Sequence, residues 1–305
     1  MDKSGMSLNR MRTFVRVVEL GSLSAAGREL GLGQPTVTRH VNELEAALGV
    51  PLLSRTTRRL VLTDEGRAYY SNCVRILRLV EQSFDEAKSA AGGATGSVRI
   101  SCTSAFGILH VSKLIFEFQD RHPDIQIDLN LTDERLDLTR HAIDLAIRLG
   151  PLTDSGAKLR SLGRSERVLV AAKSYLDAFG RPGQPADLAG HQCIRMMNIV
   201  GSERQSLVDP DGERHQAPFG GRLKVDHGLA AREALVAGRG IVAGHIWLIE
   251  DLLRGEDFEL VLPRYRLDPV PLSMLIAPGR GELSRVRLAI DFLAERITRI
   301  PGIAG

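Results

Sequence analysis

The segment GLGQPTVTRHVNELEAAL (residues 31–48) decides the fold of the N-terminal part of the chain. Proline is favoured in the first position of a helix and a glycine follows Leu48, so we expect a helix from Pro35 to Leu48. With successive residues about 100° apart, the aliphatic side chains fall in one narrow stripe of Val37, Val41, Leu44 and Leu48. This stripe is expected to face a hydrophobic core.

The opposite side of the same helix is polar. Pro35, Arg39, Asn42 and Ala46 lie away from the stripe, and Gln34, Thr36 and Thr38 flank the first turns. In the major groove of DNA, arginine can bond to guanine, glutamine and asparagine to adenine, and threonine to either base. This face therefore predicts a surface that reads base edges.

Two shorter helices are expected before it. Apolar residues recur at helical spacing from Leu8 to Val18, and Gly21 is suited to end that helix. Ser24 is expected to cap a second helix through Leu30, with a glycine-containing break before the third. A short helix, a tight turn and a polar-faced helix form a helix-turn-helix, whose second helix enters the major groove. The alternative is three solvated helices of another all-α domain.

A short hairpin is predicted over residues 51–63, where polar and apolar side chains alternate. As a wing beside the third helix, it would bring Arg55, Arg58 and Arg59 to phosphates or to a narrow minor groove. Charge supports an anionic partner here, because residues 1–96 contain thirteen Lys and Arg against ten Asp and Glu. The rest of the chain contains twenty-seven of each.

A long helix is expected from Asp64 to about Ser89, with Thr63 as its N-cap. Along it runs a heptad-like seam, interrupted by Ser83, of Tyr69, Cys73, Ile76, Val80 and Ala87. Such a seam predicts a contact between the helices of a dimer. The alternative is packing of this helix against its own domain.

A glycine-rich stretch over residues 90–97 predicts a flexible hinge before the second half. There, strand and helix signals alternate in a way typical of a parallel α/β sheet. The expected elements are strands at 98–103, 125–131 and 145–147, a helix at 106–121, a further alternation between 168 and 262, a strand at 272–276 and a helix at 282–298.

Length and composition limit the class of protein. A chain of 305 residues exceeds one ordinary core, so two or more domains are expected, and 43% hydrophobic with 25% charged residues indicates a globular protein. No apolar run is long enough to span a membrane, and charged residues near the start leave no room for a signal peptide. With only three scattered cysteines, these features predict a cytoplasmic protein without a membrane partner.

Four segments resemble the LysR-type transcriptional regulators: FVRVVELGSLSAA (14–26), LGLGQPTVTRHVNELEAALG (30–49), LLSRTTRR (52–59) and LTDEG (62–66). The N-terminal resemblance is highly specific, and a looser one extends over essentially the full length. One departure is Gly33, where the family usually has a Ser or Thr that caps the recognition helix. The resemblance implies an effector-binding domain of two α/β subdomains, similar to periplasmic solute-binding proteins.

The fold class is accordingly α/β, with an N-terminal winged helix-turn-helix and this two-subdomain effector domain. The expected parts are a DNA-binding domain at 1–63, a dimerisation helix at 64–89, a hinge at 90–97 and an effector domain at 98–305, with subdomain I at about 98–164 and 270–305 and subdomain II at about 165–269. The resemblance implies a homodimer or homotetramer on a partly palindromic DNA operator, with a small-molecule effector and RNA polymerase as further partners. The predicted DNA-binding residues are Ser24, Gln34, Pro35, Thr36, Thr38, Arg39, Asn42, Arg55, Arg58 and Arg59.

Effector-binding residues are expected beyond the carboxyl ends of strands, where open α/β sheets bind ligands. The candidates are Thr103, Ser104, Arg148, Met197, Ser202, His227 and His245, with Asp226 as the expected cap of the helix after His227. Hydroxyls and free amides near Ser104 could hold a carboxylate, so a carboxylate or aromatic metabolite is the expected effector. The alternative is that Thr103 and Ser104 are ordinary helix caps.

An enzyme has little support in the sequence. The glycines at 238, 240 and 244 precede a strand instead of following one, which contradicts a dinucleotide-binding fingerprint, and no catalytic or metal-binding motif is present. No cofactor and no metal are therefore expected. Two alternatives remain: a solute-binding or enzymatic α/β protein with a helical dimerisation domain, and a redox sensor that uses Cys102 and Cys193.

Overall fold

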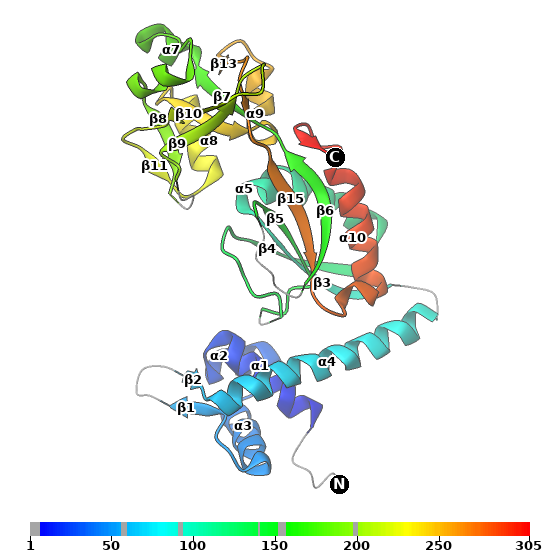
Figure 1. Cartoon of the computed structure of the whole chain (residues 1–305). Coiled ribbons are helices and arrows are strands. Elements are labelled where there is room, and N and C mark those ends of the chain that lie inside the picture. Colours follow the sequence, from blue (N-terminus) through cyan, green and yellow to red (C-terminus); the bar gives the residue numbers. More distant parts are fainter. Residues whose placement is uncertain (1–6, 56–59, 91–93, 140, 152–156, 198–200) are drawn as a thin grey trace. The chain divides into compact units, whose positions relative to one another are not determined.

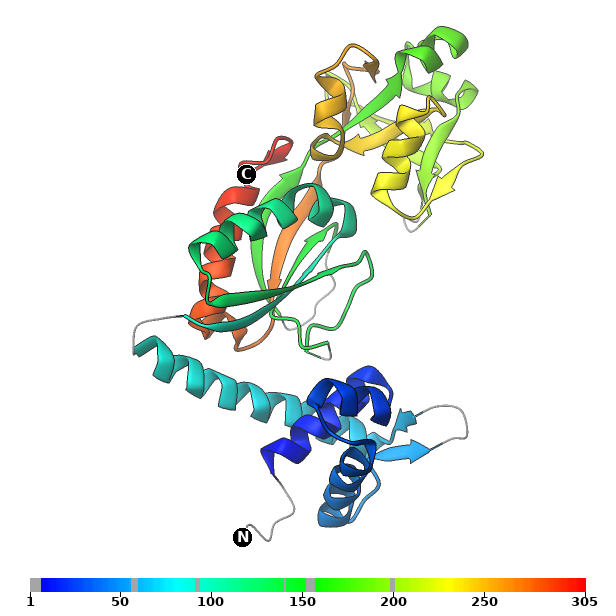
Figure 2. The ribbon, with the colours of Figure 1, turned by 180° about the vertical axis from the view of Figure 1, so that it is seen from behind.

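The computed structural model describes residues 7–55, 60–90, 94–139, 141–151, 157–197 and 201–305. The chain forms two compact units, shown from two sides in Figures 1 and 2. The first unit consists of Met1–Thr95, Leu136–Ile143 and Glu282–Ser284, and the second of Gly96–Arg135, Asp144–Gly281 and Arg285–Gly305. No helix among the described residues has the length and apolar character needed to cross a bilayer.

The first unit contains the predicted winged helix-turn-helix. Its elements are helices α1 (Leu8–Leu20), α2 (Leu23–Leu30) and α3 (Gln34–Leu48), strands β1 (Leu53–Arg55) and β2 (Leu60–Leu62), and helix α4 (Asp64–Ala90). The two strands pair antiparallel, which confirms the hairpin. The predicted cap of α2 is wrong: Ser22 is the N-cap and accepts from the amide of Ala25, while Ser24 lies inside the helix.

Helix α3 is held by its aliphatic stripe. Val37 and Val41 are buried in a cluster with Val17 of α1 and Ala26 of α2. Leu44 is buried in a second cluster, which includes Phe14 of α1 and Leu52 and Cys73 from the segments that follow α3. Burying each large aliphatic side chain contributes about 1.5–3 kcal/mol, so the stripe fixes the rotation of α3 about its own axis.

Helix α4 begins tightly packed on the base of the hairpin. The hydroxyl of Thr63 accepts from the amide of Gly66 at 2.9 Å, as expected of an N-cap, and donates to the carbonyl of Pro51 at 2.8 Å. A Cβ at Gly66 would lie 2.0 Å from the carbonyl oxygen of Leu52, so only glycine allows this approach.

The predicted seam of α4 is wrong for its first two members. Cys73 is fully buried within its own domain, and the ring of Tyr69 lies 5.7 Å from that of Phe14. Exposed apolar side chains follow further along the helix, at Ile76, Leu79 and Phe84. The side chain of Ala87 lies outside the described part of the chain.

The second unit contains a six-stranded sheet in the order β16-β6-β15-β5-β3-β4. Its strands are β3 (Gly96–Cys102), β4 (Ile125–Leu131), β5 (Leu145–Leu149), β6 (Lys158–Ser165), β15 (Val270–Ile276) and β16 (Ile303–Ala304). The accompanying helices are α5 (Ser104–Phe106), the π-helical segment η1 (Gly107–Val111), α6 (Ser112–Arg121), the 3₁₀ turn η3 (Arg280–Glu282) and α10 (Ser284–Ile297). Helices α6 and α10 lie side by side, with the rings of Phe118 and Phe292 5.3 Å apart (Figure 2).

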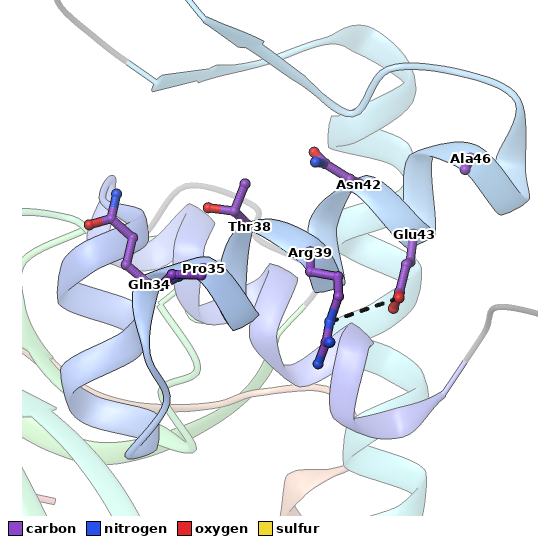
Figure 3. A pocket seen from close by; sticks show the side chains of 7 residues that line it. All are labelled: Gln34, Pro35, Thr38, Arg39, Asn42, Glu43 and Ala46. Atoms are coloured by element: carbon purple, nitrogen blue, oxygen red, sulfur yellow. Dashed lines mark ion pairs between the residues drawn. The ribbon is translucent and has the colours of Figure 1, made fainter.

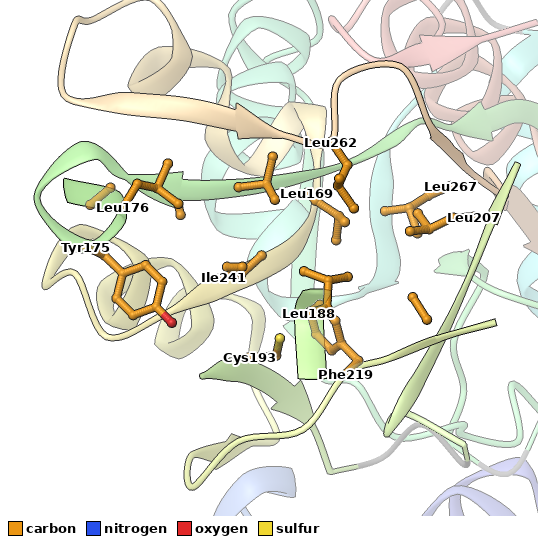
Figure 4. Close-up of a cluster of buried hydrophobic side chains, with 14 residues drawn as sticks. Leu169, Tyr175, Leu176, Leu188, Cys193, Leu207, Phe219, Ile241, Leu262 and Leu267 are labelled. Carbon is orange, nitrogen blue, oxygen red and sulfur yellow. The ribbon is translucent and has the colours of Figure 1, made fainter. Parts of the chain in front are cut away.

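A five-stranded sheet, in the order β11-β8-β12-β7-β13, and a three-stranded sheet, β10-β9-β14, make up the rest of this unit. Their strands are β7 (Arg167–Ala172), β8 (Cys193–Met196), β9 (Arg204–Val208), β10 (Arg214–Pro218), β11 (Lys224–Val225), β12 (Ile241–His245), β13 (Phe258–Val261) and β14 (Arg266–Leu267). The helices are α7 (Lys173–Phe179), the 3₁₀ segment η2 (Pro185–Gly190), α8 (Gly228–Val236) and α9 (Ile246–Leu253). Leu169, Leu188 and Phe219 belong to the hydrophobic core between these elements (Figure 4).

The sheets are mixed, so the prediction of a parallel sheet is only partly correct. Strand β3 runs parallel to β4 and β5, whereas β15 pairs antiparallel with β5 and β6. The antiparallel strands arise where the chain leaves the six-stranded sheet, from β6 into β7, and where it returns to that sheet, from β14 into β15. Alternating strand and helix signals do not reveal such passages.

Two boundaries also differ from the prediction. Gly96 and Ser97, expected in the hinge, belong to β3, while hinge residues 91–93 lie outside the described part. The helix expected from Phe106 begins at Ser104 and contains one π-helical segment before it ends at Arg121. Such π-helical turns are rare and occur mostly as single turns inside α-helices, so helical periodicity does not predict them.

A buried ion pair joins the residue before β5 to the 3₁₀ turn η3. Asp144 is 1% exposed, and its carboxylate contacts the guanidinium of Arg280 and accepts from the amide of Arg99 at 2.8 Å. Removing one member of a buried pair leaves the other charge without compensation.

We therefore expect Arg280→Met to lower the free energy of unfolding of the second unit by about 3–5 kcal/mol. Urea unfolding followed by the fluorescence of Trp247, the single tryptophan, measures this change. Arg160→Met is the matched control, because Arg160 forms an exposed pair with Asp291 and should cost less than about 1 kcal/mol. Equal losses in the two variants would contradict this account.

Candidate functional site

The outer face of α3 is open to solvent, as the sequence predicts. Gln34, Pro35, Arg39, Asn42 and Ala46 are exposed, and Thr36 and Thr38 are half-buried. A shallow depression of about 620 Å³ lies on this face (Figure 3). It is lined by Gln34, Pro35, Thr38, Arg39, Asn42, Glu43 and Ala46, so the structure brings five of the predicted DNA-binding residues together.

Ser24 has a different position from the one expected of a direct base contact. Its hydroxyl donates to Oε1 of Gln34 at 2.8 Å, across the turn between α2 and α3. The bond leaves the amino group of Gln34 free to donate in the groove. Ser24 thus orients Gln34.

The wing is tied to α3 by Glu45, a residue that the sequence analysis did not single out. One carboxylate oxygen of Glu45 accepts from the amide of Leu52 at 2.7 Å and from that of Leu53 at 3.0 Å. Arg58 and Arg59 lie outside the described residues, and so does the side chain of Arg55. The sequence signal that could have identified Glu45 is its place as a glutamate near the end of a helix, just before a turn.

His40 joins α3 to α1 and was also missed. The hydroxyl of Thr13 donates to the carbonyl of Asn9 at 2.8 Å, so His40 Nδ1 donates to that hydroxyl at 2.9 Å. Burial lowers the pKa of His40, and the nearby Glu43 carboxylate opposes this effect. The bond is consistent with a neutral imidazole protonated on Nδ1.

In the second unit, Thr103 and Ser104 lie at the end of β3, where the sequence placed them. The amide of Thr103 donates to the carbonyl of Ile147 at 3.2 Å, which sets it beside β5. The amide of Ser104 donates to the carboxylate of Asp133 at 3.0 Å. An intramolecular carboxylate therefore already accepts from the helix start that the sequence predicted to hold an anion.

Arg148 lies beside these residues on β5 and is buried. Its guanidinium donates to the hydroxyl of Ser101 at 2.6 Å and to the carbonyl of Glu134 at 3.4 Å. Burial lowers the pKa of Arg148, and the nearby Asp133 opposes that shift. A guanidinium with these neutral partners can take an anionic ligand.

His227 is itself the N-cap of α8, so the prediction that Asp226 caps this helix is wrong. The ring Nδ1 of His227 accepts from the amide of Leu229 at 3.2 Å. The starts of α8 and α5 lie close together, because a Cβ at Gly228 would lie 3.1 Å from that of Ala105. Two predicted ligand-binding segments, around Ser104 and His227, are thus brought together.

His245, at the start of α9, is hydrogen-bonded to the buried Ser165 at the end of β6. Trp247 Nε1 can only donate, so the hydroxyl of Ser165 accepts it at 2.8 Å, and the same hydroxyl is hydrogen-bonded to His245 Nδ1 at 2.7 Å. Burial, together with the charge of Arg167, lowers the pKa of His245 to about 3, so the ring is neutral at physiological pH.

Helix α5 and its π-helical continuation meet α9 at aromatic rings. The ring of Phe106 lies 5.0 Å from that of Trp247, and His110 Nε2 donates to the carbonyl of Trp247 at 2.9 Å. The ring of His245 also stacks on that of Trp247, with 5.3 Å between the ring centroids. Sequence reasoning missed Phe106, His110 and Ser165, since each finds its partner far along the chain.

The remaining two effector candidates lie in a loop after β8. Met197 follows this strand directly, with 64% of its surface exposed, and Ser202 is half-buried in a turn before β9. Residues 198–200 between them lie outside the described part. Among the described residues, no hydrogen bond joins Met197 or Ser202 to Ser104, His227 or His245.

The redox alternative is not supported by the environment of the cysteines. Cys102 lies in the six-stranded sheet and Cys193 in the five-stranded sheet, and both are buried. Burial raises the pKa of each thiol to about 12, which leaves little reactive thiolate.

One group of potential metal ligands occurs among the described residues, at Asp209, Glu213 and His215 of the β9–β10 hairpin. The Asp209 carboxylate accepts from the amides of Asp211 and Glu213 at 3.0 and 2.8 Å and contacts His215 Nε2 at 2.7 Å. These bonds account for the turn, so we assign the group to the hairpin.

Comparisons with known proteins agree with this architecture. Residues 8–67 match the family of the bacterial regulatory helix-turn-helix protein, lysR family, and residues 91–298 match the LysR substrate binding domain. A transcriptional regulator of Xanthomonas campestris pv. campestris is 34% identical over 95% of this chain and 85% of its own length. The transcriptional activator AaeR of Escherichia coli is 32% identical over 96% of this chain and 94% of its own.

A solved structure is similar to the chain over nearly its full length. The virulence activator AphB of Vibrio cholerae has a TM-score of 0.63 and 28% identity, and the match covers 95% of this chain and 99% of that one. A winged helix-turn-helix joined to a two-lobed α/β domain defines a DNA-binding transcriptional regulator with an effector-binding domain. The chain belongs to the LysR family of such regulators, which excludes the enzyme alternative.

The buried His245 predicts a specific pH dependence of stability. An unfolded histidine binds a proton below about pH 6.5, whereas folded His245 does so only near its pKa of about 3. Stability is therefore lost as the pH falls from 6.5 toward 3, by about 1.4 kcal/mol at pH 5.5.

His245→Gln should remove this part of the pH dependence. The free energy of unfolding is measured at pH 7.5 and 5.5 by urea unfolding followed by Trp247 fluorescence. The difference between the two pH values should be about 1.4 kcal/mol smaller in the variant than in the unchanged protein. His141→Gln, at an exposed position, is the control and should leave the difference unchanged. The same pH dependence in His245→Gln and the unchanged protein would refute the assignment.

Proposed function

We propose that α3 is the recognition helix and lies in the major groove of an operator. Gln34, Thr36, Thr38, Arg39 and Asn42 read base edges, and Pro35 fits against the groove at the start of the helix. The observation that carries this proposal is the rotation of α3, whose aliphatic side is buried while its polar side is exposed. Arg55, Arg58 and Arg59 of the wing contact the phosphate backbone.

Regulators of this family form oligomers, and we propose that this chain forms a homodimer or a dimer of dimers. The exposed apolar side chains Ile76, Leu79 and Phe84 of α4 support a helix–helix contact, shifted along the helix from the predicted seam. A symmetric dimer then requires a partly palindromic operator whose half-sites lie one helical turn, or a multiple of it, apart. Bound there, the regulator acts on transcription by RNA polymerase.

We also propose that a small anion is the effector of the second unit. Thr103, Ser104, Arg148, His227 and His245 supply hydroxyl, amide, guanidinium and imidazole donors near the starts of α5, α8 and α9. Met197 and Ser202 would contribute from the loop after β8. A ligand that binds one arrangement of the two lobes more tightly shifts the population toward it and changes DNA binding.

The division of labour between helix and wing predicts two distinct phenotypes. Arg39→Ala should cost about 1–3 kcal/mol on an operator and relax specificity at one base pair, as expected for a bidentate contact to guanine. Arg58→Ala should weaken binding to all duplexes alike and reduce the salt dependence by about one ion per site. Gel-shift titrations against an operator duplex and a scrambled duplex at several salt concentrations measure both. Identical behaviour of the two variants would rule out this division.

The anion site predicts a fluorescence response, because Trp247 contacts both Phe106 and His245. Titration with acetate, succinate and benzoate should give a saturable change with at least one of these acids. Benzylamine is the control of matched size and opposite charge for benzoate, and it should give no change. Insensitivity to all three acids would count against the site.

A further inference from the structure

The DNA-reading face of α3 contains an acidic side chain that the proposed function does not explain. Glu43 lines the same depression as Arg39 and Asn42 and is 38% exposed at its side chain. Because DNA is a polyanion, a carboxylate on this face weakens binding unless its charge is compensated or used.

The structure shows how the charge of Glu43 is compensated. One oxygen lies 2.8 Å from Nε of Arg10, which comes from helix α1. The other oxygen lies 4.0 Å from Nε of Arg39, one helical turn before Glu43 (Figure 3). Arg10 therefore fixes the carboxylate from outside α3, and the carboxylate faces the inner side of the Arg39 guanidinium.

This geometry leaves the outer edge of Arg39 available. The carboxylate approaches Nε, so the two terminal nitrogens stay clear of it, and terminal guanidinium nitrogens can bond O6 and N7 of guanine together. A long arginine side chain loses conformational entropy when it adopts one geometry, and a neighbour that already holds it reduces this loss.

We propose that Glu43 is a positioning residue that holds Arg39 in the orientation for guanine and that Arg10 anchors Glu43. This inference rests on the proposed role of α3 in reading DNA. It assigns Glu43 and Arg10 to the selectivity of the regulator, although neither needs to contact a base. Two simpler roles predict other results: an ordinary i,i+4 helix pair affects stability alone, and simple repulsion of phosphates lowers affinity for every sequence alike.

The test uses the full-length protein and a duplex that it enriches from a random pool. In each half-site, every guanine is replaced in turn. The contact of Arg39 is the guanine whose replacement weakens binding by the unchanged protein but does not affect binding by Arg39→Ala. The readout is the selectivity at this position, defined as the ratio of the Kd values of the replaced and original duplexes.

Glu43→Gln should lower this ratio by at least about threefold, which is a part of the discrimination expected for a bidentate contact. Because the change removes a negative charge, binding to a scrambled duplex should tighten or stay the same. Arg10→Gln should lower the ratio as well. The double variant with Arg10→Gln and Glu43→Gln should have a ratio no lower than that of the less selective single variant, since both residues act through one contact. In the Arg39→Ala background, Glu43→Gln should not change the ratio further.

Glu65→Gln is the matched control, because it removes one exposed negative charge from the first turn of α4, outside the depression. It should leave the ratio unchanged. An unchanged ratio in Glu43→Gln, or an equal loss with and without Arg39, would overturn the inference. A thermal unfolding temperature that falls in Glu43→Gln with the ratio intact would assign the residue a structural role only. If the unchanged protein enriches no duplex, the proposed function itself fails, and the two failures are thus distinguished.

Discussion

The burial of one narrow aliphatic stripe determines what the first unit can present to a partner. Val37 and Val41 are enclosed by α1 and α2, and Leu44 by the segments that follow α3. Rotating α3 by about half a turn would expose this stripe and bury the guanidinium of Arg39 without a partner, which costs several kcal/mol. The polar face is therefore turned outward by the core, and Ser24, Glu45 and His40 only refine the position of groups that the core has already directed.

Periodicity and turn residues were sufficient to predict the helix-turn-helix, the hairpin and the long helix, because these signals lie within about twenty residues. They failed at Ser24, where two serines two positions apart could each cap α2 and only the backbone geometry selects Ser22. They also failed at Cys73, whose spacing suits both a dimer seam and the core that it enters. In the second unit, strand order was hidden because β6 and β15 connect separate sheets.

In the candidate sites, too, some features could be predicted from the sequence and others could not. Residues on one exposed face, such as Gln34 and Arg39, follow from the sequence. Ser165 does not, because its partners His245 and Trp247 lie 80 and 82 residues away in the chain. At the end of β3, Asp133 already accepts from the helix start. A ligand carboxylate must compete with this internal one, so affinity there depends on how much more the ligand gains from Arg148 and from the opposite lobe.

The contact at Gly66 has a mechanical consequence. The first turn of α4 rests directly on Leu52, and Leu52 is bonded through its amide to Glu45 at the end of α3. These two contacts connect α4, the base of the hairpin and α3 in series. A bulkier residue at position 66 would clash with the carbonyl of Leu52, so it would disturb the packing of α4 on the hairpin base and, through Leu52, the link to α3.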